Sequence, residues 1–164
     1  MNKAFFIPAL LWMILIFFFS AMPEDVSTEQ SDYVSVRLQK IILATLSGDS
    51  EVAMDEWEEW TEDAPHFSVR KAAHVFEYTM LCVLMFVGFA GGRYARRLSF
   101  FGTVLYSVTD EIHQLFVPGR SGTFVDVAID STGALLGFVF IMLAGPWMME
   151  MKKRILKEFA VRKR

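Results

Sequence analysis

The chain has 164 residues, of which 54% are hydrophobic and 15% aromatic, with 16 phenylalanines. A water-soluble core of this size does not need so many apolar residues, and their long runs are typical of membrane-spanning helices. The formal net charge of −3 excludes little, because the charges are segregated along the chain. The single cysteine, Cys82, lies in an apolar run, which excludes an intramolecular disulfide and predicts a small packing or lipid-facing residue.

The first apolar run covers residues 4–22, carries no charge and is long enough to cross the hydrocarbon of a bilayer. A cleaved signal peptide is the competing interpretation, with Lys3 as its charged start. The run is longer than the apolar region of most signal peptides, which favours a retained transmembrane helix.

Residues 23–69 are too polar to span a membrane. Within them, residues 32–46 place apolar side chains at helical spacing, which predicts an amphipathic helix lying on the outer membrane surface. Trp57 and Trp60 are then expected at the level of the lipid headgroups. A solvated acidic loop with a short helix is the alternative interpretation of this segment.

Three further apolar runs, at about 72–91, 98–116 and 125–149, predict three more transmembrane helices. Arginines follow the second run, and a basic stretch, 150–164, follows the fourth, which predicts that both lie in the cytoplasm. The expected fold is therefore all-α, a polytopic membrane helix bundle that forms one domain over residues 1–164. The segment 23–69 would be extracytoplasmic, and both termini would be cytoplasmic.

The basic tail most simply enforces this topology and binds anionic lipid headgroups, at roughly 1 kcal/mol for each basic residue. Nucleic-acid binding is not expected, because nothing beside the tail resembles a recognition module. Membrane lipids are the partners that this arrangement predicts.

Polar side chains from three predicted helices and one loop fall in the outer third of the bundle. A carboxylate that faces lipid near the midplane costs roughly 2.5–3.5 kcal/mol on insertion scales, so these groups are expected to face a common pocket. Helical spacing puts His74 with Glu77, and Asp126 with Asp130, on shared faces. The full set is Arg70, Lys71, His74, Glu77, Asp110, Glu111, His113, Gln114, Arg120, Asp126 and Asp130.

The charges of this set do not balance, because five carboxylates accompany only three basic side chains. A partly desolvated cluster would then take up protons or bind a cation. A simpler role remains open for Asp126, which follows Thr123 in a capping-box pattern. Near these residues, Gly133 and Gly137 form a GxxxG pattern, which is typical of close packing between helices.

The segments RKAAHVFEY (70–78), DEIHQLFVPGRSG (110–122) and DVAIDSTGALLG (126–137) resemble the motifs of VanZ-like membrane proteins. Their order and spacing match over residues 68–140, and the acidic outer segment is not part of the shared pattern. The resemblance implies a small multispanning bacterial membrane protein, related to a factor linked with low-level teicoplanin resistance. It places motif positions at Arg70, Lys71, His74, Glu77, Tyr78, Asp110, Glu111, Gln114, Pro118, Gly119, Arg120, Asp126 and Asp130.

Three functions stay open. A membrane enzyme would act on an envelope component at the outer leaflet, a binding or transport module would hold a lipid-linked precursor or move protons, and a polar network would serve folding alone. In the enzyme, the histidines and carboxylates would either hold a divalent metal ion as cofactor or serve as general acid and base. The candidate catalytic residues are His74, Glu77, Asp110, Glu111 and Asp130, the candidate binding residues are Arg70, Lys71, Gln114, Arg120 and Asp126, and the candidate metal ligands are His74, Glu77, Glu111 and His113.

Overall fold

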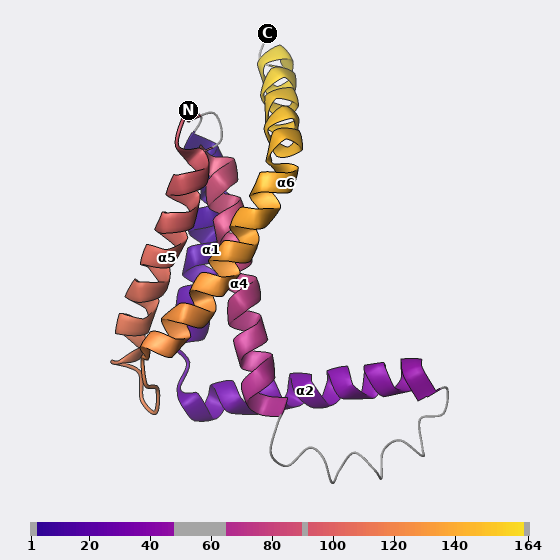
Figure 1. Ribbon diagram of the computed structural model, residues 1–164, viewed down its shortest axis with the longest axis vertical. Helices are drawn as coiled ribbons and strands as arrows, with labels where there is room; N and C mark the ends of the chain where they lie inside the picture. The colour runs from indigo at the N-terminus through magenta and orange to yellow at the C-terminus, as the bar shows by residue number, and fades with distance from the viewer. Residues whose placement is uncertain (1–2, 48–64, 90–91, 163–164) are drawn as a thin grey trace.

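The computed structural model describes residues 3–47, 65–89 and 92–162, and these ranges are mostly helical and contain no strand. The predicted all-α fold is confirmed. The acidic stretch with Trp57 and Trp60 lies outside the described residues. The elements shown in Figure 1 are η1 (Lys3–Phe6), α1 (Ile7–Ser20), α2 (Glu24–Ser47), α4 (Pro65–Phe89), α5 (Ala95–Gln114) and α6 (Phe124–Arg162).

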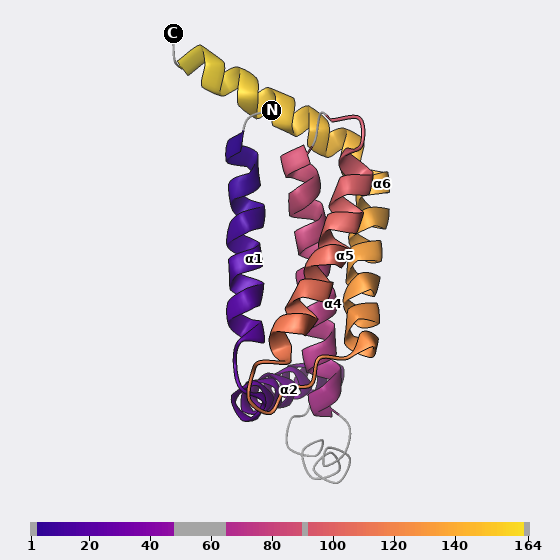
Figure 2. The same cartoon turned by 90° about the vertical axis from the view of Figure 1, so that its left-hand side faces the viewer.

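Figure 2 shows α1, α4, α5 and the first part of α6 side by side, with α2 lying across one end of this bundle. The C-terminal part of α6 runs across the opposite end. At the end covered by α2, called the α2 end below, α1 and α5 finish and α4 and α6 begin. Segments far apart in the sequence therefore present their polar residues at one level.

Several helices extend beyond the predicted apolar runs. α4 begins at Pro65 rather than at about residue 72, because proline suits a first helical turn and the basic residues before the apolar run are compatible with a helix. α2 begins at Glu24 rather than at residue 32, with two acids in its first turn that complement the helix dipole. α6 continues past Pro146 to Arg162, and Figure 2 shows it changing direction on the way, as a proline inside a helix permits.

Two helices are long and apolar enough to cross a membrane among the described residues, namely Val69–Phe89 and Phe124–Glu158. Ala4–Ser20 qualifies only together with Glu24–Ser31, to which it is joined at a bend of 105°. α5 does not qualify by composition, because it carries arginines at its start and carboxylates near its end. The chain thus has the apolar helices of a membrane protein.

The predicted GxxxG pattern places α6 directly against α4. A Cβ at Gly133 would collide with the backbone oxygen of Val75, and one at Gly137 would lie 2.7 Å from the backbone oxygen of Thr79. The hydroxyl of Thr79 donates a 2.9 Å hydrogen bond to the carbonyl of Gly133. Cys82 is fully buried next to Gly137, so it is a packing residue rather than a lipid-facing one.

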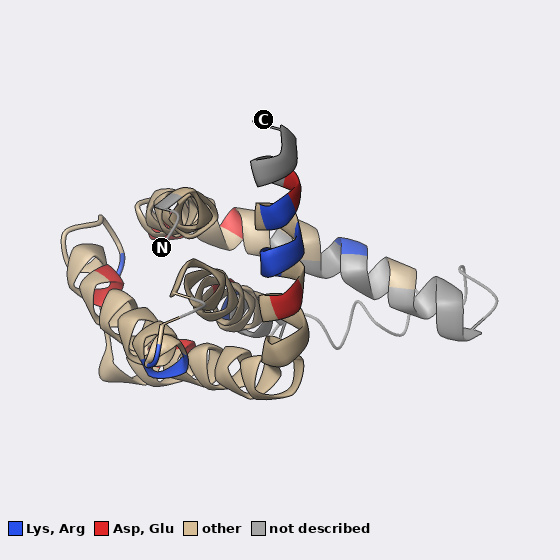
Figure 3. Cartoon of the chain, turned by 90° about the horizontal axis from the view of Figure 1, so that it is seen from above, with Lys and Arg blue, Asp and Glu red and all other residues tan. Residues whose placement is uncertain are grey.

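The opposite end of the bundle is basic, and there Lys152 joins α6 to α4. Its ammonium group donates a 2.6 Å hydrogen bond to the carbonyl of Val87 in the last turn of α4, where a cation complements the helix dipole. It also lies 4.5 Å from the centre of the Phe5 ring. Figure 3 looks onto this end and shows lysine and arginine on the C-terminal part of α6 and at the start of α5.

Replacing Gly133 with alanine should destabilise the bundle by about 1–3 kcal/mol, because a backbone oxygen in a packed helix cannot move aside. Gly102→Ala is the matched control, since its new Cβ meets only the flexible end of Met85. Thermal unfolding in detergent, followed by the loss of monodisperse protein, measures the difference. Equal midpoints for the two variants would contradict this account of α4–α6 packing.

Candidate functional site

Asp110 is the point at which three helices meet at the α2 end. Its Oδ2 accepts a 2.8 Å hydrogen bond from the hydroxyl of Ser20 in α1 and a 3.1 Å bond from the hydroxyl of Tyr78 in α4. Gln114, one turn further along α5, donates to the same oxygen at 3.3 Å and to Ser20 Oγ at 2.8 Å. All four side chains are buried, so this network fixes α1, α4 and α5 relative to one another.

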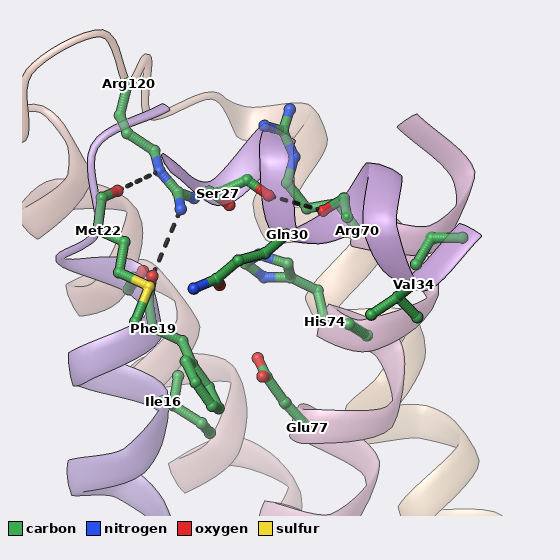
Figure 4. A pocket seen from close by; sticks show the side chains of 14 residues that line it. Ile16, Phe19, Met22, Ser27, Gln30, Val34, Arg70, His74, Glu77 and Arg120 are labelled. Carbon is green, nitrogen blue, oxygen red and sulfur yellow. Dashed lines mark hydrogen bonds between the residues drawn. The ribbon is translucent and has the colours of Figure 1, made fainter. Parts of the chain in front are cut away.

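His74 and Asp130 join α4 to α6 beside this network. Nδ1 of His74 lies 3.3 Å from Oδ1 of Asp130, and Asp130 is almost completely buried. A carboxylate next to Nδ1 favours a proton on that nitrogen and fixes the ring orientation. Figure 4 shows the His74 ring projecting into the space bounded by α1, α2 and α4. Asp130 therefore fixes the orientation of the ring from the α6 side, and His74 still lines space that a ligand can enter.

The first turn of α6 is held by two carboxylates and a lysine. Thr123 caps the helix, because its Oγ1 accepts from the backbone N–H of Asp126 and its hydroxyl donates to Asp126 Oδ2 at 2.8 Å. The backbone N–H of Thr123 donates to Oε2 of Glu111 at 3.0 Å. Lys71 forms an ion pair with Asp126. The cap by Thr123 is confirmed, but the second bond of the predicted capping box is absent, because the backbone N–H of Thr123 binds Glu111 instead of Asp126. Asp126 also joins α6 to α4 through Lys71.

The loop between α5 and α6 carries Arg120 on a tight turn. The N–H of Arg120 donates to the carbonyl of Val117, and Gly119 between them has φ +77°, which explains the Pro-Gly sequence. The guanidinium donates to the carbonyls of Met22 at 3.1 Å and Phe19 at 3.4 Å. Burial lowers the pKa of Arg120, and the charge of Arg70 lowers it further, but a guanidinium stays charged in proteins.

Two adjoining cavities occupy this end of the bundle. The first, about 270 Å³, lies beneath α2 between α1 and α4, and we call it the α2 cavity. Figure 4 shows Glu77 and His74 pointing into it from α4, opposite Ile16 and Phe19 of α1. The second, about 260 Å³, lies between the starts of α4 and α6 and the Arg120 loop, and we call it the polar cavity. Both are lined by Arg70, His74 and Arg120.

The structure separates the predicted site residues into two groups. One group lines one or both cavities, and the other does not. The lining residues are Arg70, Lys71, His74, Glu77, Glu111, Gln114, Arg120 and Asp126. Asp110 and Asp130 lie behind them and hold Ser20, Tyr78, Gln114 and His74 in place. Of the five candidate catalytic residues, only His74, Glu77 and Glu111 therefore face space that a ligand can enter.

The four predicted metal ligands do not converge. Glu111 turns toward Thr123 at the start of α6, whereas the ring of His113 stacks on Phe17 of α1 with 4.4 Å between ring centres. Two residues apart on a helix, their side chains leave about 200° from each other. Across the described part of the chain, no three histidine, cysteine, aspartate or glutamate side chains are placed to hold a metal ion.

The sequence interpretation missed two contributions to this site. Ser20 binds Asp110, and its signal was a hydroxyl at the end of an otherwise apolar run. The start of α2 supplies one wall of the α2 cavity through Ser27, Gln30, Ser31 and Val34, which share a helix face. Only residues 32–46 were predicted to form a helix on the membrane surface, so the spacing at positions 27, 30, 31 and 34 was not connected with a site.

Comparison with known proteins supports a family assignment for most of the chain. A family model described as VanZ/LLP1 matches residues 5–145, which include every residue that lines the two cavities. No curated protein and no solved structure gives a significant match. Because the matched region covers most of the chain, including α1, α2, α4, α5, the first part of α6 and the VanZ-like motifs within them, this chain belongs to the VanZ/LLP1 family.

Proposed function

We propose that α1, α4, α5 and α6 all cross the membrane, with the α2 end outside and both termini in the cytoplasm. α5 fits this topology despite its composition, because its polar side chains face the bundle. Ser99, Thr103 and Ser107 are fully buried, whereas Phe101 and Leu105 are each 65% exposed, as lipid-facing residues would be. The lysines and arginines of α6 and α5 lie at the opposite end, which agrees with a cytoplasmic location.

We also propose that the polar cavity binds the anionic group of an envelope component at the outer leaflet. The observation that carries this proposal is the position of Arg70. Its side chain lines both cavities, and within the described part of the chain no carboxylate pairs with it. Lys71 and Arg120 line the same cavity, as do the carboxylates of Glu24, Glu111 and Asp126. Lys71 is paired with Asp126, which leaves Arg70 as the cation best placed to bind an anionic group.

The bound component would lie against groups capable of proton transfer. His74, oriented by Asp130, and Glu77 one turn away both point into the α2 cavity. A neutral imidazole and a carboxyl group at such a position can act as general base and acid on a bound ligand. Action on an envelope component by proton transfer is therefore the chemistry that this arrangement supports best, and a contribution to glycopeptide resistance is the phenotype to test.

Proton-coupled movement of a ligand is a second candidate function, favoured by a different observation. Asp110, Glu111 and Asp130 are nearly completely buried, yet each has a carboxylate oxygen with no hydrogen-bond donor in the described part of the chain. Buried carboxylates with free oxygens are suited to taking up and releasing protons in membrane proteins. Flux in liposomes driven by a pH gradient distinguishes this function from proton transfer to a bound ligand.

Replacing Arg70 with alanine should abolish the function while leaving the fold intact, because no described hydrogen bond or ion pair of the bundle depends on it. Teicoplanin susceptibility of host cells and mass spectrometry of lipids that copurify with the protein provide the two readouts. Lys153→Ala, at the opposite end and exposed, is the control. Arg70→Ala protein that folds and keeps both its phenotype and its bound lipids would refute the anion-binding proposal.

The topology predicts which loops a membrane-impermeant maleimide can reach on intact cells. In a Cys82→Ala background, Ser121→Cys in the Arg120 loop should be labelled, since it lies at the α2 end and is exposed. Tyr94→Cys, which replaces an exposed residue between α4 and α5, should be labelled only after the cells are opened. Labelling of position 94 on intact cells would show that the orientation is reversed.

A further inference from the structure

A third cavity lies on the outside of the bundle, between α5 and α6. It is a groove of about 420 Å³ whose walls are mainly apolar. Ile112, Leu115 and Phe124 line it and are 53%, 61% and 93% exposed. Val108, at its inner limit, lies almost two helical turns before the end of α5, so the groove runs along the helices toward the middle of the proposed membrane span. In that membrane, a hydrocarbon chain suits this surface.

The groove adjoins the polar cavity. Glu111 and Thr123 line both spaces, and the hydrogen bond between them forms the boundary. Glu111 is only 5% exposed, and its Oε1 has no donor among the described residues. One oxygen of this buried carboxyl group therefore lacks a hydrogen-bond donor in the described structure. A polar group of a ligand that extends from the groove into the polar cavity can supply that donor. Nothing in the packing of the helices accounts for that oxygen.

On its other side, the polar cavity adjoins the α2 cavity through Arg70, His74 and Arg120. There α2 contributes uncharged hydrogen-bonding groups, namely Ser27, Gln30 and Ser31. Three kinds of lining thus follow one another: apolar in the groove, charged with both signs in the polar cavity, where Arg70 pairs with no described carboxylate, and a mixture of apolar and hydrogen-bonding groups beneath α2. Each matches one part of an amphiphile.

We infer that the ligand is a lipid phosphate with a hydroxylated headgroup. Its hydrocarbon chain lies in the α5–α6 groove, its phosphate lies in the polar cavity near Arg70, and its headgroup lies beneath α2. This inference rests on the proposed function and names the class of molecule that the site accepts. The phosphate distinguishes this molecule from other amphiphiles. Its chain confines it to the lipid phase and so raises its local concentration at the site above that of a free anion.

Photo-crosslinking with a single-chain alkyl phosphate that carries a diazirine at the chain end tests this inference on the full-length protein in detergent. Label should appear at groove residues such as Ile112 and Val127, and peptide mass spectrometry maps it. The alcohol with the same chain should label the groove about tenfold less, as the loss of one or two charge-assisted hydrogen bonds would give. Inorganic phosphate at equal concentration should not displace the lipid probe.

Variants separate the groove from the anion site. Val127→Trp fills the groove and should remove its label, whereas Leu143→Trp, on the exposed face of α6 outside the groove, should leave it unchanged. Phosphate-dependent label at Ile16 or Val69 of the α2 cavity would overturn the position of the chain but keep the proposed function. Label that is independent of the phosphate and of Arg70→Ala would overturn both. Complete displacement by inorganic phosphate would identify a free anion as the ligand.

Discussion

A single carboxylate oxygen, Oδ2 of Asp110, sets the geometry of the α2 end. It accepts hydrogen bonds from Ser20, Tyr78 and Gln114, which lie on α1, α4 and α5. A buried carboxylate without such donors would cost several kcal/mol, so each donor must keep its position for the bundle to be stable. The ends of three helices are thereby held at one level. Ser20 and Gln114 of this network also line the two cavities, so the network forms part of their walls.

Basic side chains complete the frame by capping helix ends from other segments. Arg120 binds carbonyls at the end of α1, and Lys152 binds a carbonyl at the end of α4 on the opposite side of the bundle. Each cation satisfies acceptors that have no partner inside their helix. Arg120 has a second consequence, since the same guanidinium lines both cavities. A structural cap and a ligand-facing charge thus coincide in one residue.

The sequence predicted the elements that depend on long apolar runs and on local spacing. Patterns of a few residues predicted four features that the structure shows. These are the helical class, the basic end, the cap by Thr123 and the close contact at Gly133. The sequence also predicted that the polar residues lie at one end of the bundle. Successive helices of the bundle run in opposite directions, so the end of one helix lies beside the start of the next. Helix ends were less predictable, since α4 and α6 continue through charged residues and proline.

The finer arrangement of the site could not be read from spacing. Asp110 and Glu111 are adjacent in the sequence, yet one binds α1 and α4 and the other binds the start of α6, because successive residues leave a helix in different directions. The same geometry separates Glu111 from His113, so these two predicted ligands do not meet, and the described residues contain no group placed to hold a metal ion. The part of α2 in the α2 cavity depends on a bend of 105° after α1. Pro23 signals the break between the two helices, but the direction in which α2 leaves cannot be read from residue spacing.

The end of α1 meets the end of α5 beside the cavities, and cross-linking of two introduced cysteines tests this contact most directly. In a Cys82→Ala background, cysteines at positions 20 and 114 replace side chains whose polar ends are 2.8 Å apart. Because glutamine is longer than cysteine, a short bifunctional thiol reagent, rather than a direct disulfide, should bridge the pair readily in native membranes. Cysteines at positions 20 and 115 form the matched control, because Leu115 is exposed and faces away from α1. Rapid cross-linking of the first pair alone is predicted. No cross-link at 20 and 114, or equal cross-linking of both pairs, would contradict the account.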